Sequence, residues 1–245
     1  MSKIGISDFC YFWFPAKLRQ LEINMKDEKL NRRKLLGSTF ALGAGIAMAG
    51  VARADETLKA CGLTPAQTEG PFYPIQDQLD KNTDLTFVDG RGKKAVGEVV
   101  FLKGVVQDEF CRPVKGALVE IWQACHTGKY NHPSDPNPAK LDPNFQYWGQ
   151  AITNEKGEYH FKTIIPGAYP ATSTWMRPPH IHFKVNLRGF NELTSQLYFK
   201  GNKFNNGDRI LRSLSREERE RVIVDFVTKA DGRKEGIFNI SIKSI

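Results

Sequence analysis

Two histidines separated by one residue form the motif with the clearest chemical potential. His180 and His182 lie in an apolar segment that continues to Leu187. If this segment is a strand, residues i and i+2 point to the same face, so both imidazoles are directed at one point, as two metal ligands from one strand would be. Two ordinary strand histidines, one exposed and one packed, would give the same spacing. Arg177 just before the pair, and Tyr169 in a rigid Pro-Gly turn upstream, favour a functional site.

Tyrosines supply the other candidate ligands. Tyr169 precedes the histidine pair, and Tyr130 follows a β-branched, aromatic segment farther upstream. A phenol has a pKa near 10, so only a strong Lewis acid displaces its proton. Ferric iron is such an acid, and hard oxygen ligands suit it better than they suit zinc or copper. Two phenolates would offset two of its three positive charges. The set Tyr130, Tyr169, His180 and His182 therefore predicts an Fe(III) site with room for substrate or water.

Short apolar segments with turn residues between them predict the fold that must position these side chains. A long loop rich in Asn, Pro, Asp and Gly covers 125–147, and Ser215 with Glu218 forms a capping box that opens a helix reaching to about 230. The predicted strands cover 98–106, 117–124, 149–153, 158–164, 180–187, 193–199 and 236–245. This pattern predicts an all-β protein, a β-sandwich of short antiparallel strands with long loops and one short C-terminal helix.

Residues 31–54 are typical of an export signal, whereas residues 1–24 fit no signal-peptide pattern. A basic segment with paired arginines precedes a Gly/Ala-rich apolar run that ends in a small-x-small cleavage pattern at Ala54. The run is short of the roughly 18–20 strongly apolar residues that a membrane span needs. We therefore predict a twin-arginine signal, with Met25 as the true start and an over-extended N-terminus before it. Residues 55–96, here called the lead-in, are expected to pack on a core domain at 97–245.

Charge and cysteines narrow the possible partners and the compartment. Residues 1–54 hold nine of the 35 basic and four of the 27 acidic residues, so the formal net charge of +8 falls to +3 without them. So small a charge predicts no nucleic-acid partner. Cys61, Cys111 and Cys125 remain, and an oxidising compartment permits one disulfide without indicating which pair forms.

Several motifs together resemble one family. The segments 122–130, 166–170, 177–183 and 196–199, with 68–73 before them, are similar in type and order to motifs of the intradiol ring-cleavage dioxygenases. The similarity is closest to the iron-bearing (beta) subunit of protocatechuate 3,4-dioxygenase. No long helical domain of the kind found in catechol dioxygenases is expected before the sandwich, because the lead-in is short and rich in Pro and Gly.

The resemblance implies a role for each matching residue. It implies that Tyr130, Tyr169, His180 and His182 bind Fe(III), and that Tyr169 leaves the metal to accept a substrate proton. Arg177 would stabilise the electron-rich ring and Gln196 would position it, although Arg177 could instead form a surface salt bridge and Gln196 could be an ordinary strand amide. The residues implied to line or support the substrate pocket are Thr68, Gly70, Pro71 and Tyr198.

The resemblance also implies a reaction, and alternatives stay open beside it. The implied substrates are O2 and a catechol, protocatechuate or a substituted catechol, cleaved between its hydroxyls to a cis,cis-muconate-type diacid. We expect a periplasmic or secreted homo-oligomer with no stable membrane anchor after cleavage. The alternatives are a non-catalytic periplasmic β-sandwich that binds aromatic acids, and a zinc hydrolase built on the histidine pair, which would need a carboxylate as third ligand.

Overall fold

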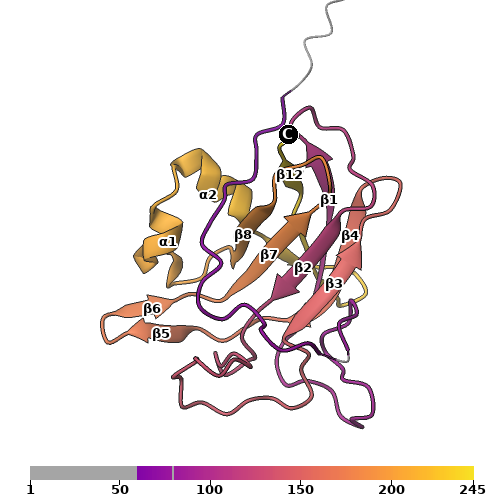
Figure 1. The fold of residues 1–245 in the computed structure, drawn as a ribbon. Coiled ribbons are helices and arrows are strands. Elements are labelled where there is room, and N and C mark those ends of the chain that lie inside the picture. Colours follow the sequence, from indigo (N-terminus) through magenta and orange to yellow (C-terminus); the bar gives the residue numbers. More distant parts are fainter. Residues whose placement is uncertain (1–59, 79) are drawn as a thin grey trace, which may run out of the picture. The chain divides into compact units, whose positions relative to one another are not determined.

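The computed structural model describes residues 60–78 and 80–245, which form a β-sandwich (Figure 1). The first sheet contains β1 (Val99–Asp108), β4 (Glu158–Ile164), β10 (Phe226–Thr228), β11 (Lys234–Ile237) and β12 (Ile240–Ile242). The second sheet, in the order β3-β2-β7-β8-β9, contains β2 (Leu118–Trp122), β3 (Trp148–Ile152), β7 (His180–Asn186), β8 (Leu193–Phe199) and β9 (Ile223–Val224). The predicted all-β sandwich is thereby confirmed.

The remaining elements are short and lie around the second sheet. The hairpin of β5 (Tyr169–Thr172) and β6 (Trp175–Arg177) precedes β7, and the 3-10 turn η1 (Asn205–Gly207) leads into α1 (Arg209–Arg212) and α2 (Arg216–Val222). In Figure 1 the two helices lie beyond β8, at the edge of the sheet opposite β3. None of the helices in the described part of the chain is long and apolar enough to span a membrane.

The alternating side chains of β7 explain how one strand serves both the core and the site. Ile181, Phe183 and Val185 are fully buried and join the apolar core between the two sheets, as strand periodicity requires. His180 and His182 point to the other face, which an ordinary sandwich exposes to solvent. Here both histidines are buried as well. Other chain segments must therefore cover the outer face of the second sheet.

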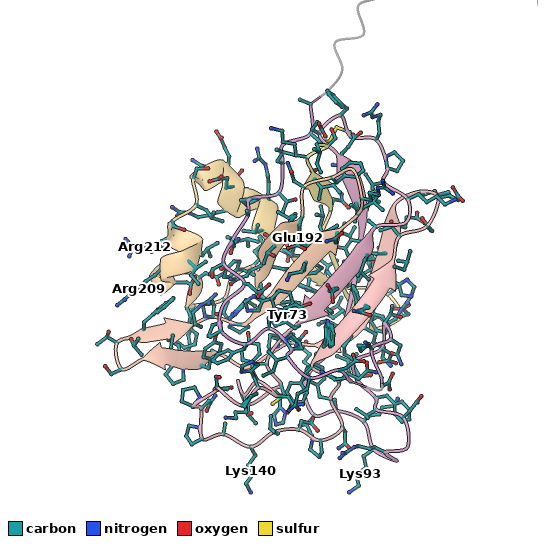
Figure 2. The ribbon with its side chains drawn as sticks, in the orientation of Figure 1. Tyr73, Lys93, Lys140, Glu192, Arg209 and Arg212 are labelled. Atoms are coloured by element: carbon teal, nitrogen blue, oxygen red, sulfur yellow. A yellow bond between two sulfur atoms is a disulfide. The ribbon has the colours of Figure 1, made fainter. Side chains whose placement is uncertain are left out.

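The lead-in provides part of that cover. In Figure 1 its indigo segment crosses in front of the second sheet, and Figure 2 shows Tyr73 lying over that sheet. Gln67 N donates to Thr194 O at 2.9 Å, and Ser195 Oγ donates to Pro65 O at 2.8 Å, so the lead-in is hydrogen-bonded along β8. A disulfide between Cys61 and Cys111 ties its N-terminal end to the connection after β1.

That disulfide answers a question that the sequence left open. Cys61 pairs with Cys111, and Cys125 is a buried free thiol. The predicted signal peptide, the start at Met25 and the cleavage after Ala54 concern residues outside the described part of the chain. They stay predictions.

The prediction of a helix from Ser215 to about 230 is correct at its start and wrong at its C-terminal end. The capping box at Ser215 is present, but α2 ends at Val222 and the chain continues as β9 and β10. Ile223 and Val224 are apolar and β-branched, and they pair in parallel with Tyr198 and Phe199 of β8. Pairing at the edge of the sheet therefore outweighs the helical tendency of the segment.

Two further expectations need correction. The predicted strand at 236–245 is divided into β11 and β12, both parallel to β1, so the sandwich also contains parallel pairs. The division falls at Phe238, whose backbone oxygen packs against Gly104 of β1. A Cβ added at Gly104 would lie only 1.8 Å from that oxygen. The single predicted helix is in fact two, since Asp208 caps the additional helix α1.

Candidate metal centre

Four buried side chains meet on the outer face of the second sheet. Tyr130 Oη lies 3.2 Å from His180 Nε2, and the ring centroids of His180 and His182 are 4.9 Å apart. The Tyr130 and Tyr169 rings are 5.6 Å apart and perpendicular, and Tyr169 lies 5.8 Å from the His180 ring. The structure thus brings together all four residues that the sequence predicts as metal ligands.

Neighbouring groups fix the orientation of both imidazoles. His180 Nδ1 lies 2.7 Å from Pro178 O, a carbonyl that can only accept, so the proton is on Nδ1 and the lone pair is on Nε2. The ring of His182 stacks on Trp122 of the adjacent strand, with 4.7 Å between centroids and 12° between planes. His180 therefore presents an unprotonated nitrogen towards Tyr130.

Burial sets the charge state of the four side chains. It lowers the pKa of His180 and of His182 well below the ordinary value, and the nearby cation of Arg177 lowers both further. Burial raises the pKa of Tyr130 well above its ordinary value and raises that of Tyr169. Both imidazoles are thus neutral and can each offer a nitrogen lone pair to a metal ion. Both phenols keep their protons unless a strong Lewis acid displaces them.

This donor set fits a ferric ion. Two neutral imidazole nitrogens and two phenol oxygens form a mixed set whose hard oxygens favour Fe(III), and ionised phenolates would offset part of its charge. The neighbours of the histidines are tyrosines rather than the carboxylate that a zinc hydrolase would require. The residues on this face therefore suit iron better than zinc.

Two glycines bring the tyrosine-bearing loops into contact. Gly167 N donates to Cys125 O at 2.9 Å, which joins the turn before Tyr169 to the turn before Tyr130. A Cβ at Gly167 would lie 2.4 Å from Gly128 N and 2.5 Å from His126 O. Only glycine permits this approach of two backbones.

The substitution Gly167→Ala is therefore expected to separate the two tyrosines. We expect a loss of about 1–3 kcal/mol in the free energy of unfolding, the usual cost of overpacking, and a lower iron content. Denaturant unfolding and metal analysis measure the two effects. The matched control is Gly92→Ala, because nothing lies within 4 Å of a Cβ at Gly92. Equal iron content in both variants would contradict the proposed role of this contact.

A buried polar network lies beside the four candidate ligands. Arg177 Nη2 donates to Gln196 Oε1 at 2.6 Å, and Tyr198 Oη donates to Gln196 Oε1 at 3.1 Å. The register of β7 and β8 explains this, since Gln196 is directly opposite His182 and Tyr198 is directly opposite His180. All three predicted residues therefore lie at the site.

Asp208 is a member of this network that the sequence analysis missed. Its Oδ2 accepts a hydrogen bond from Arg177 Nε at 2.8 Å, and neither side chain is appreciably exposed. Arg177 therefore does form a salt bridge, but the ion pair is buried and not at the surface, as that alternative expected. The structure shows Asp208 as the N-cap of α1, and an N-cap position indicates nothing about Arg177.

The lead-in also lines the site. Gln196 Nε2 donates to Thr68 O at 2.9 Å, and a Cβ at Gly70, whose φ is +73°, would lie 3.6 Å from His182 Cε1. Phe72, another residue that the sequence analysis did not select, packs on Tyr130 with 4.8 Å between ring centroids. Pro71 is exposed between these two residues. Thr68 and Gly70 therefore lie at the site, with Pro71 at its solvent side.

Known proteins are similar to this chain in sequence and fold. A family model described as "Dioxygenase" matches residues 68–243. The chain is 38% identical over 170 residues to the protocatechuate 3,4-dioxygenase beta chain of Burkholderia cepacia, covering 68% of this chain and 71% of that one. It is 31% identical over 175 residues to catechol 1,2-dioxygenase 2 of Acinetobacter lwoffii, covering 62% and 58%. The chain thus spans less than two thirds of that second relative.

Solved structures agree with these relatives. The dioxygenase domain of a carbohydrate-binding fusion protein from Streptomyces sp. SirexAA-E superposes with a TM-score of 0.57 at 27% identity, covering 75% of this chain and all of that one. An intradiol ring-cleavage dioxygenase from Tetranychus urticae gives a TM-score of 0.60 at 24% identity, which bears on the fold alone, with 75% and 95% covered. The chain belongs to the intradiol ring-cleavage dioxygenase family.

Proposed function

We propose that this protein is a non-haem Fe(III) dioxygenase. It cleaves the aromatic ring of a catechol-type substrate between the two hydroxyls with O2, and it releases a cis,cis-muconate-type diacid. The observation that carries the proposal is the meeting of two neutral imidazoles and two phenols on one buried face. The names of the relatives, which are protocatechuate and catechol dioxygenases, support the same reaction class.

Tyr130, Tyr169, His180 and His182 would hold the iron. Held there, the ion would supply the Lewis acidity for ionising catechol hydroxyls and for making the ring reactive towards O2. Among the four, Tyr169 is the residue that we assign to proton transfer. It begins the β5–β6 hairpin, and its phenolate oxygen can take a proton from a substrate hydroxyl at the site.

Arg177 and Gln196 would act on the bound ring. The guanidinium of Arg177 is buried beside both tyrosines, where a low local dielectric strengthens its attraction for negative charge that develops on the substrate. Gln196 bridges Arg177 and the Thr68 carbonyl, so it fixes the cation relative to the lead-in. Gly70, whose φ is +73°, lets the lead-in backbone turn beside His182, where it would help to cover the iron-binding face.

The test is a spectrum followed by an assay. Purified protein with stoichiometric iron should absorb visible light through phenolate-to-iron charge transfer, and an anaerobic catechol should shift that band. Admitting O2 should then consume one O2 per substrate and give a product with the absorbance of a muconate. Iron-loaded protein that stays colourless, or that binds catechols without consuming O2, would reject the proposal. The second outcome would favour a non-catalytic binder of aromatic acids.

The finer assignments form part of the proposal. A panel of protocatechuate, catechol and substituted catechols, compared by kcat/KM, would identify the substrate.

We propose export through the twin-arginine pathway to the periplasm or the medium, which the Cys61–Cys111 disulfide supports because such bonds persist in oxidising compartments. Export of a signal-sequence fusion that depends on the arginine pair would test this. We also propose a homo-oligomer, since one chain carries both the candidate ligands and the lead-in.

A further inference from the structure

Asp208 joins two parts of the chain through its two carboxylate oxygens. One oxygen, Oδ2, accepts from Arg177 Nε at 2.8 Å, and the other, Oδ1, accepts from Leu211 N at 2.7 Å as the N-cap of α1. The side chain is completely buried. A carboxylate held at both oxygens has little freedom to turn, so α1 fixes the place at which the Arg177 guanidinium is bound.

The guanidinium of Arg177 is held along two of its three nitrogens. Asp208 takes Nε, and Nη2 donates to Gln196 Oε1 at 2.6 Å and lies 3.5 Å from Tyr198 Oη. Among the residues that the structure describes, no hydrogen bond from Nη1 is present. Because the guanidinium is planar and rigid, bonds at Nε and Nη2 determine the direction of Nη1. That nitrogen is the donor that stays available to a bound ligand.

The charges of the neighbourhood explain why an acid is needed here. The Arg177 cation lies beside Tyr169, Tyr130 and Tyr198, and it contributes to lowering the pKa of both histidines. Phenolates at the site would attract this cation strongly in a buried environment. Asp208 supplies a competing negative charge at Arg177 Nε, which keeps Arg177 in one orientation.

A second contact joins the start of α1 to β6. Arg209, labelled on α1 in Figure 2, packs on the Trp175 ring with 5.3 Å between the guanidinium carbon and the ring centroid. The guanidinium carbon of Arg177 lies 5.5 Å from the same centroid. The start of α1 thus contacts β6 at two residues, because Arg209 packs on Trp175 and Asp208 binds Arg177. Its buried contact, through Asp208, is the one that reaches the site.

We propose that Asp208 is a positioning residue for ring cleavage, which orients Arg177 so that Nη1 meets the reacting ring. This inference rests on the proposed function and extends it by one residue outside the set that binds iron or substrate. Asp208 acts only through Arg177. Its removal should therefore change the reaction of bound substrate and leave iron binding unchanged.

The first test is Asp208→Asn, which preserves the cap on Leu211 and removes the charge that holds Arg177. We expect kcat to fall about 10- to 100-fold, the usual effect of removing a group that orients a functional residue. KM should change less, and the iron content and the visible spectrum of the resting protein should be those of the wild type. Ser215→Ala is the matched control, because it removes the N-cap of α2 without touching Arg177. It should keep the wild-type kcat.

The second test is a double-mutant cycle with Arg177→Met. If Asp208 acts through Arg177, adding Asp208→Asn to Arg177→Met should cause no further loss of kcat. An equal further loss, an unchanged kcat in Asp208→Asn alone, or a parallel loss of iron would overturn the inference. The double variant carries neither buried charge, so it keeps the test decisive if Asp208→Asn alone folds poorly. A wild-type protein that consumes no O2 with any catechol would instead reject the proposed function.

Discussion

The substitution His182→Ala is expected to remove iron and to lower catechol cleavage by more than about 100-fold. Removing a residue that merely supports a metal ligand can already cost about 100-fold, and His182 is a proposed ligand itself. His182 is buried, stacked on Trp122, and next to both His180 and Tyr130. Alanine offers no nitrogen, and the remaining imidazole and two phenols would bind the ion weakly. Metal analysis of the purified protein and O2 uptake with a catechol measure the two effects.

The control for this prediction is His160→Ala. His160 is an exposed residue on β4 of the first sheet, so the two variants lose the same group from different sheets. We expect wild-type iron content and activity in His160→Ala. Iron at the wild-type level in His182→Ala would show that the ion is held elsewhere and would contradict the assigned ligand set.

Local pattern predicted the parts of the site that depend on strand geometry. His180 and His182 share a face because β7 is a regular strand, and its intervening Ile181 and Phe183 point into the core. Period-two alternation is present in the sequence itself, so the shared face of the two histidines follows from the order of residues alone. The same holds for the β-sandwich class.

Contacts between distant segments could not be derived in this way. Asp208 and Arg177 are separated by 31 positions, and neither segment carries a local signal for the other. The partner of Cys61 was open for the same reason, since three thiols allow three pairings and only the fold selects Cys111. The end of α2 depends on an edge pairing with β8, which outweighs helix propensity. Each of these features is a product of tertiary packing.

The cover on the outer face of the second sheet connects fold with function. An antiparallel sheet in a sandwich commonly leaves one face in water, where charges are screened and phenols and imidazoles titrate near their ordinary values. The lead-in and the β5–β6 hairpin bury this face, and burial is the largest cause of the pKa shifts of His180 and Tyr130. The covering segments therefore create the dry environment that the proposed chemistry requires.

The substitution Arg177→Met is expected to lower kcat by about 10²- to 10³-fold, as the loss of one preorganised electrostatic group commonly does. Methionine fills a similar volume but cannot stabilise negative charge on the ring. Iron binding should persist, because the four candidate ligands are unchanged. Steady-state kinetics on iron-replete protein, with the visible spectrum recorded beside them, provide the measurement.

Stability must be separated from catalysis in this variant. Arg177→Met leaves the carboxylate of Asp208 buried without its partner, which should cost about 3–5 kcal/mol in the free energy of unfolding. Adding Asp208→Asn removes that charge and should restore much of the stability while kcat stays low. If the double variant regained both stability and activity, the low rate of Arg177→Met would be a folding defect. Arg177 would then have no direct part in ring cleavage.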